Sequence, residues 1–271
     1  MPELPEVETT RRGLLPHVVG RSIQDVVVRN PNLRWPVPKE LARRARGERV
    51  RDIRRRGKYL LFDLSRGHLL VHLGMSGRLT VVPSGTAPRK HDHVDIVLDD
   101  GKALRLNDPR RFGAVLWLDS PAEEHALIRN LGIEPLDVSF SGDALRERAR
   151  GRRVAVKQFL MNGNIVTGVG NIYASEALFR AGIHPGRSAG RISAARWDRL
   201  ADSIRHTLES AITAGGSTLR DFVSAEGRPG YFQHRHAVYD REGKACPRCR
   251  GKIRALRQGQ RSTFFCPRCQ T

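Results

Sequence analysis

The sequence predicts an α+β fold, with an N-terminal antiparallel β-sandwich, a helical domain and a cysteine-rich β-hairpin at the C-terminus. Three observations support this prediction. Short apolar runs of strand length fill the first half of the chain, helical periodicity dominates after Pro135, and all four cysteines lie beyond residue 245. We therefore expect three domains, at residues 1–134, 135–236 and 237–271.

A short helix is predicted at the start of the chain. Helical periodicity extends from Pro5 to Leu15. Pro5 suits the first turn of this helix, and the carboxylates of Glu6 and Glu8 complement the positive end of its dipole. Ordinary helix initiation is therefore one interpretation of the first residues.

The second interpretation of the same residues is chemical. Removal of Met1 would leave Pro2 with a free secondary amine, which is a nucleophile, and the carboxyl group of Glu3 lies beside it. An amine that attacks a sugar or carbonyl carbon needs a proton donor for the departing oxygen and then a base, and one carboxyl group serves both purposes. Glu6, one helical turn further on, offers a second carboxyl group.

The β-sandwich is predicted from seven apolar runs, at residues 22–28, 59–64, 69–73, 79–82, 94–98, 102–106 and 114–118. Asp99, Asp100 and Gly101 separate the fifth run from the sixth and have the composition of a hairpin turn. This hairpin and the succession of short runs favour an antiparallel sandwich or barrel.

Helices are predicted in the second half of the chain. One follows a Ser193 N-cap and ends at Gly215 and Gly216, and another runs from an Asn171 cap to Gly182. A short helix and a glycine-rich segment at 163–170 precede Asn171, which gives a helix, two turns and a helix. Residues 215–236 are predicted to form a long loop.

The charge of the chain favours a polyanionic partner. Lys and Arg number 48 against 28 acidic residues, a net charge of +20. Nucleic acid is the leading candidate, because each neutralised phosphate releases counterions, although a genome that encodes Arg liberally would also raise the charge. No apolar signal region or long apolar run is present, so we expect no membrane association and a location in the cytosol or in an organellar interior.

The cysteines form two C-x-x-C pairs, and the spacing of the pairs is typical of a zinc site. The residues are Cys246, Cys249, Cys266 and Cys269. Four thiolates leave no open coordination position, so one structural Zn²⁺ is expected, with two disulfides or iron as the alternatives. Basic residues around the cysteines would face a phosphate backbone: Arg248, Arg250, Lys252, Arg254, Arg257 and Arg261.

Several motifs together resemble the formamidopyrimidine-DNA glycosylase family. They are the Pro2-Glu3 terminus and the segments at 57–60, 72–77, 90–93, 108–113 and 168–173, with the four-cysteine finger at the end. The resemblance covers the whole chain. The sister endonuclease VIII branch fits less well, since it lacks the Met and Arg-Arg-Phe segments.

This resemblance implies a bifunctional DNA glycosylase and abasic-site lyase of base excision repair. Pro2 would attack C1′ of a flipped nucleotide that carries an oxidised purine, such as 8-oxoguanine or a formamidopyrimidine, while Glu3 donates a proton. The resulting Schiff base would allow β,δ-elimination of both phosphates. The partner would be double-stranded DNA with oxidised purines or abasic sites, bound by a monomer.

The resemblance also assigns further residues. Met75, Arg110 and Phe112 would fill the gap that the flipped nucleotide leaves. Other positions would hold or protonate phosphates around the lesion: Lys58, His91, Arg110, Arg152, Asn171 and Arg261. Lys157 and the loop through Ser217, Thr218, Arg228 and Tyr231 would read the extruded base.

Simpler interpretations of some of these residues remain open. Met75 and Phe112 also suit a core, and His91, with His93 and Asp95, also fits the alternating polarity of a strand. Two other functions compete with the enzyme described above. One is a non-catalytic nucleic-acid-binding protein with a zinc ribbon, and the other is an enzyme that excises oxidised pyrimidines.

Overall fold

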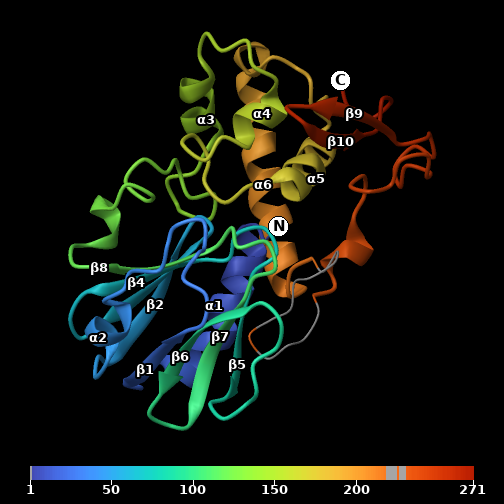
Figure 1. The fold of residues 1–271 in the computed structure, drawn as a ribbon. Coiled ribbons are helices and arrows are strands. Elements are labelled where there is room, and N and C mark those ends of the chain that lie inside the picture. Colours follow the sequence, from blue (N-terminus) through green and yellow to red (C-terminus); the bar gives the residue numbers. More distant parts are fainter. Residues whose placement is uncertain (1, 218–224, 226–229) are drawn as a thin grey trace. The chain divides into compact units, whose positions relative to one another are not determined.

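The computed structural model of the chain describes residues 2–217, 225 and 230–271, which fold into two compact units (Figure 1). Unit 1 comprises Met1–Asn130 and Ala214–Tyr231, and unit 2 comprises Leu131–Thr213 and Phe232–Thr271. Among the described residues no helix has the length and apolar content to span a membrane.

Unit 1 is the predicted antiparallel β-sandwich. One four-stranded sheet has the order β1-β6-β7-β5 and the other has the order β2-β3-β4-β8. The strands are β1 (Ile23–Val28), β2 (Val50–Arg56), β3 (Tyr59–Leu64), β4 (His68–His72), β5 (Arg78–Pro83), β6 (Asp92–Leu98), β7 (Lys102–Asn107) and β8 (Ala114–Leu118). Buried residues from both sheets and from the N-terminal helix form one hydrophobic core.

All seven predicted strands are present, and the hairpin at residues 94–106 is confirmed by the antiparallel pairing of β6 with β7. Three elements of unit 1 were not predicted from the sequence: β2, a helix α2 (Leu41–Ala45) and a 3₁₀ turn η1 (Ala122–Glu124). β2 contains four arginines and only two apolar residues, Val50 and Ile53, both of which are buried. Its strand conformation depends on its antiparallel pairing with β3. No local sequence pattern predicts this pairing.

The N-terminal helix α1 (Leu4–Val18) is attached to β2 through a buried carboxylate. Glu8 receives hydrogen bonds from Arg11, Arg12 and, at 3.1 Å, from Arg55 of β2. Burial by itself would raise the pKa of Glu8, but the hydrogen bonds from Arg11 and Arg12 and the charges of Arg11 and Arg55 lower this pKa to about 2. Glu8 therefore stays ionised and fixes the helix that begins beside Pro2 and Glu3.

Unit 2 contains the helices predicted from the sequence and one more. The helices of this unit are α3 (Gly142–Ala149), α4 (Val156–Leu160), α5 (Asn171–Ala181) and α6 (Ala194–Thr213), with 3₁₀ turns η2 (Ala189–Arg191) and η3 (Phe232–Arg235). α5 ends at Gly182, whose φ of +70° is the left-handed conformation expected of a glycine C-cap. α3 was not predicted, although Ser141 caps it by accepting a hydrogen bond from the Ala144 N–H at 3.1 Å.

One predicted cap was wrong by a residue. The N-cap of α5 is Gly170, and Asn171 is the first helical residue. The Asn171 side chain bonds to groups elsewhere in unit 2 instead of capping its own helix.

The C-terminal hairpin is present as predicted. β9 (Arg254–Gln258) pairs antiparallel with β10 (Arg261–Phe265), between the two cysteine pairs. The pairing of Arg261 with Gln258 next to the turn places Arg261 at the start of the second strand.

A Glu8→Gln substitution should lower the free energy of unfolding by about 1–3 kcal/mol at pH 7, because it leaves three arginine donors with a neutral acceptor. The folded-state pKa of Glu8 is depressed, so its stabilisation is complete above about pH 4.5 and is lost as the pH falls toward 2. Urea unfolding of both proteins between pH 7 and pH 2 measures this. The stability difference should shrink at low pH, and a constant difference would contradict the assignment.

Candidate functional site

The first residues of the chain are buried and are held by Glu6. Pro2 is buried, and Glu3 and Glu6 are 2% and 1% exposed. One carboxylate oxygen of Glu6 accepts the backbone N–H of Glu3 at 2.8 Å, and the other accepts the backbone N–H of Ser217 at 2.8 Å. Glu3 is the N-cap of α1, so helix initiation and a fixed position for the Pro2-Glu3 pair are the same arrangement. Both carboxylate oxygens of Glu6 are therefore engaged by backbone N–H groups, those of Glu3 and Ser217.

Met75, Arg110 and Phe112 lie on the surface of unit 1 in two adjacent loops, 73–77 and 108–113. Met75 and Phe112 are each 37% exposed, so neither belongs to the core. The guanidinium carbon of Arg110 lies 4.8 Å from the centroid of the Phe112 ring. A Cβ atom on Gly74, where φ is +64°, would lie 2.5 Å from the Phe112 carbonyl carbon, so only glycine permits this approach of the two loops.

Asp108 fastens both loops to each other. It is fully buried, and its carboxylate accepts the Ser76 hydroxyl at 3.1 Å and the Gly113 N–H at 2.8 Å. Its backbone N–H donates to the His91 carbonyl at 3.0 Å, and its own carbonyl is 2.9 Å from Nε2 of His93. One residue therefore sets the positions of the loop of Met75, the loop of Arg110 and the residue before β6.

His72 links the same loops from the end of β4. Its Nδ1 accepts the Gly74 N–H at 3.2 Å. Burial and the nearby charge of Lys58 lower the pKa of His72 to about 4, although a hydrogen bond with the Phe112 backbone opposes the shift. The ring is therefore neutral at neutral pH, as its acceptor role requires. Lys58, between β2 and β3, therefore lies close enough to His72 for its charge to act on the ring.

A second group of predicted residues lies within unit 2. The Lys157 ammonium donates to Oδ1 of Asn171 at 2.7 Å, to Oγ1 of Thr263 at 2.8 Å and to the Ser262 carbonyl at 3.2 Å. Nδ2 of Asn171 also donates to the Ser262 carbonyl, at 3.1 Å. Because Ser262 follows Arg261, this group joins the start of α5 to the strand that carries Arg261.

Arg152 is placed differently from the Asn171 group. It is exposed on the segment after α3, and its Nε donates to the Arg148 carbonyl at 2.7 Å. Its own carbonyl accepts the Ser188 hydroxyl at 3.1 Å and the Gly190 N–H at 2.9 Å. These backbone contacts fix the position of an exposed cation.

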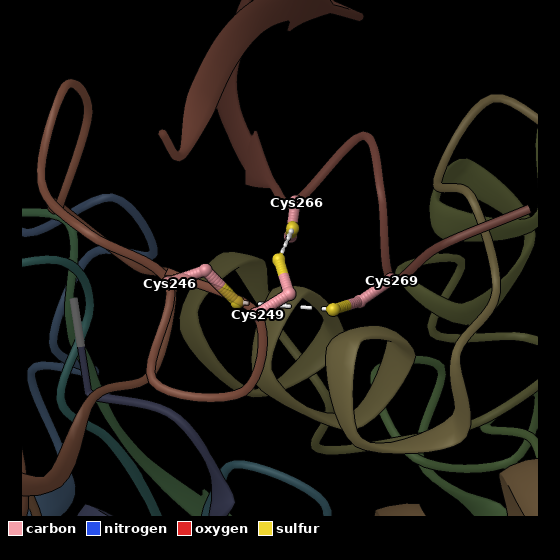
Figure 2. A group of neighbouring side chains, drawn as sticks. All are labelled: Cys246, Cys249, Cys266 and Cys269. Carbon is pink, nitrogen blue, oxygen red and sulfur yellow. Dashed lines mark hydrogen bonds between the residues drawn. The ribbon is translucent and has the colours of Figure 1, made fainter. Parts of the chain in front are cut away.

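The four cysteines converge as a metal site (Figure 2). Their sulfur atoms all lie within 4.8 Å of one another, with 3.9 Å between Cys246 and Cys269 and 3.5 Å between Cys249 and Cys266. A tetrahedral Zn²⁺ at about 2.3 Å from each sulfur requires S–S separations of about 3.8 Å, whereas a disulfide requires about 2.05 Å. The thiols therefore fit one tetrahedral ion, and all four are free of disulfides.

The metal site is fastened to α5. The Arg248 guanidinium donates to the carbonyls of Phe179 and Arg180, at 3.1 and 3.0 Å, and lies over the Phe179 ring. Arg248 therefore supplies hydrogen-bond donors to carbonyl groups at the end of α5. The buried carboxylate of Glu176 accepts the backbone N–H groups of residues 237–239, which lead into the finger.

The predicted residues thus fall into two groups, one in each unit. In unit 1 the structure brings together the loops of Met75, Arg110 and Phe112, with His91 and Lys58 nearby, and separately fixes Pro2 and Glu3. No role was predicted for His72, Asp108 or Glu176, and their presence in or near the motifs at 72–77, 108–113 and 168–173 is the only sequence signal that points to them. Tyr231 is 62% exposed, whereas Thr218 and Arg228 lie outside the described residues.

His93 and Asp95 take up structural partners. Nε2 of His93 contacts Asp108, and the Asp95 carboxylate binds Arg105 at 2.8 Å and Arg29 at 2.6 Å. Within the part of the chain that the structure describes, the four cysteines are the group of three or more potential ligands that converges on a metal position.

Three parts of the chain match family models of domains found in formamidopyrimidine-DNA glycosylases. Residues 1–115 match the formamidopyrimidine-DNA glycosylase N-terminal domain, residues 131–223 match the H2TH domain of the same enzymes, and residues 243–271 match the zinc finger found in FPG and IleRS. The formamidopyrimidine-DNA glycosylases of Syntrophotalea carbinolica and Methylococcus capsulatus are 57% and 56% identical to the chain over 270 residues, the full length of each protein.

Solved structures agree with this match. The MutM (Fpg) protein from Thermus thermophilus is 39% identical, has a TM-score of 0.89, and is matched over 99% of this chain and 98% of its own. The Lactococcus lactis Fpg in complex with DNA that contains an abasic site is 33% identical, with a TM-score of 0.92 over 99% of both chains. The match to a zinc finger identifies the ion of the four-thiol site as Zn²⁺.

A Cys266→Ser substitution should reduce the zinc content from one ion per chain to none and unfold the β9–β10 hairpin. A structural zinc contributes on the order of 10 kcal/mol to the folding of so small an element, which has little core of its own. Metal analysis and amide hydrogen exchange measure the two effects. Lys244→Ala, an exposed change in the same segment, is the control and should keep the metal. Unchanged protection of β10 in the zinc-free protein would contradict a structural role for the ion.

Proposed function

Because the chain belongs to the formamidopyrimidine-DNA glycosylase family, we propose that it removes oxidised purines, namely 8-oxoguanine and formamidopyrimidines, from duplex DNA and then cuts the strand. The observation that carries this proposal is the Pro2-Glu3 pair, fixed at the start of α1 by Glu6. A binding module would have no use for a reactive amine beside a buried carboxyl group. The solved relatives bound to abasic-site and Fapy-dG DNA support the same class of substrate.

Pro2 is the proposed nucleophile. Once Met1 is removed, its nitrogen attacks C1′ of the damaged nucleotide, the bond from C1′ to the base breaks, and the base departs with the proton that the amine loses. The sugar ring opens with a proton from Glu3 on its oxygen, which leaves an iminium cation between Pro2 and C1′. The cation acidifies the C2′ hydrogen. Loss of that proton expels the 3′ phosphate, and a second elimination expels the 5′ phosphate.

Glu3, rather than Glu6, is the proposed acid. Both carboxylate oxygens of Glu6 accept backbone N–H groups, from Glu3 and from Ser217. Protonation of Glu6 would disrupt contacts that hold the chain start, so Glu6 suits a positioning role. Glu3 is adjacent to the nucleophile and is 2% exposed, in surroundings where water competes little for its proton.

Met75, Arg110 and Phe112 are proposed to replace the flipped nucleotide in the base stack. Flipping costs a few kcal/mol, which groups inserted into the gap offset. An exposed thioether, an exposed aromatic ring and a guanidinium stacked on that ring suit this purpose, and Asp108 and His72 hold their loops in one arrangement.

Phosphate binding is proposed for cationic and amide side chains on each unit: Lys58, His91 and Arg110 on unit 1, and Arg152, Asn171 and Arg261 on unit 2. The net charge of +20 adds a long-range attraction for DNA. The zinc ion is bound by four thiolates and takes no part in the chemistry. We propose that a single chain acts on each lesion, in the bacterial cytosol. Of the three predicted domains, residues 1–134 would carry the chemistry, and residues 135–236 and the zinc finger at 237–271 would contact the DNA.

Borohydride trapping tests the nucleophile. Protein without Met1, incubated with duplex DNA that contains 8-oxoguanine opposite cytosine and then with borohydride, should form a covalent adduct at Pro2, because the reagent reduces an iminium. Peptide mapping locates the adduct. The absence of an adduct would refute the enzyme and favour a non-catalytic binding protein, and faster cutting of thymine glycol than of 8-oxoguanine would favour oxidised-pyrimidine excision.

Two carboxamide variants separate the roles of Glu3 and Glu6 in the same assay. Glu3→Gln should bind the damaged duplex with normal affinity and lose base excision at least a hundredfold, the usual effect of removing a general acid. Base excision that survives in Glu3→Gln and disappears in Glu6→Gln would move the acid role to Glu6.

An Asp108→Asn substitution should reduce excision of 8-oxoguanine from duplex DNA about tenfold to a hundredfold. Asparagine cannot accept both the Ser76 hydroxyl and the Gly113 N–H as the carboxylate does, so the two loops lose their common anchor. Cutting of an abasic site in single-stranded DNA, where no gap needs filling, should change little. Asp119→Asn, at a 74% exposed side chain in unit 1, is the control. Equal losses on both substrates would contradict the proposed role of Asp108.

A further inference from the structure

Lys157 is a deeply buried lysine that the proposed chemistry leaves without a clear task. Its side chain is 1% exposed, among the least exposed of all the large side chains. A buried ammonium is costly unless several oxygen atoms surround it. The Lys157 ammonium meets such oxygens on Asn171, Ser262 and Thr263, at 2.7, 3.2 and 2.8 Å. Its position follows from these contacts, and all of them lie within unit 2.

We propose that Lys157 is a positioning residue that locks Asn171 to the strand of Arg261, and that it touches neither the extruded base nor a phosphate. This inference rests on the proposed function and refines it. A side chain that is 1% exposed has almost no surface to offer a ligand. The partners of its ammonium, in contrast, are an amide at the first turn of α5 and two groups of β10.

The geometry shows how the lock acts on Asn171. The ammonium takes Oδ1, which fixes the orientation of the amide, so Nδ2 is directed at the Ser262 carbonyl and toward the Tyr239 hydroxyl, at 3.1 and 3.4 Å. The Ser262 carbonyl accepts from Lys157 and from Asn171 together. The amide of Asn171 and the backbone beside Arg261 are therefore parts of one network.

Thr263 permits a test without a change of charge. Thr263 is fully buried and cannot contact DNA itself. Thr263→Val replaces its hydroxyl with a methyl group, so any loss of DNA affinity in this variant results from the broken hydrogen bond with Lys157. Lys157→Met is the stronger change, because it removes the ammonium and keeps the length of the side chain. Lys244→Met removes one exposed positive charge from unit 2 and is the matched control.

The affinity of each variant is measured for a duplex that carries a tetrahydrofuran abasic-site analogue, after zinc analysis and a thermal melt show that the variant is folded at the assay temperature. Lys157→Met should bind about tenfold more weakly than wild type and Thr263→Val about threefold more weakly, in line with lost hydrogen bonds. In the Asn171→Ala background, Lys157→Met should cause less than about a twofold further loss, since both changes break one network.

Three results would overturn the positioning role. They are unchanged affinity in folded Thr263→Val, additive losses from Lys157→Met and Asn171→Ala, or a Lys157→Met protein that binds and cuts abasic-site DNA normally but no longer excises 8-oxoguanine. The last result would indicate that Lys157 recognises the extruded base. Wild-type protein that fails to bind the analogue duplex or to form the Pro2 adduct would instead refute the proposed function, so the two failures are distinguishable.

Discussion

The structure depends on one constraint: a charged group that leaves water must find a full set of hydrogen-bond partners. Buried charges recur at the points where functional segments have to be fixed. Glu6 holds the chain start, Glu8 holds α1 against β2, Asp108 holds two surface loops, and Lys157 holds Asn171. Each charge has donors or acceptors from segments distant in sequence, so its desolvation is offset only when those segments are in place.

This constraint explains how the proposed site fixes the loops that carry exposed side chains. Met75 and Phe112 are too exposed for core packing to hold them. Asp108 and His72 hold the backbones of their loops by hydrogen bonds, and the close approach of Gly74 leaves little space for an alternative arrangement. The side chains thus remain available to a ligand while their loops do not have to be ordered on binding, which lowers the entropic cost.

The finger is stabilised in the same way but with a metal ion. Its own apolar cluster is small, since it consists of Val238, Cys246, Ile253 and Cys266 with Phe179 of α5. The thiolates and their ion supply the missing folding energy. Arg248 and Glu176 then fasten the finger to the helix of Asn171 by polar contacts. Arg261 is therefore presented by an element whose order is coupled to α5.

The sequence by itself determined the elements with strong local signals. Short apolar runs of strand length predicted seven strands, helical periodicity with Gly182 and Gly215 predicted the long helices, and two C-x-x-C pairs predicted the metal site. Whole-chain motifs indicated the family. These predictions succeeded because strand-length apolar runs, helical periodicity and metal-ligand spacing each depend on residues that lie close together along the chain.

Only the tertiary structure decided the remaining features, because each joins residues that are remote in sequence. The arginine-rich β2 is a strand because β3 pairs with it, and Asn171 is not a cap because Lys157 and Ser262 engage its amide. The same holds for Asp108, whose carboxylate spans two loops. Long-range hydrogen bonds leave no periodic trace in the sequence, so their partners become evident only when the chain is folded.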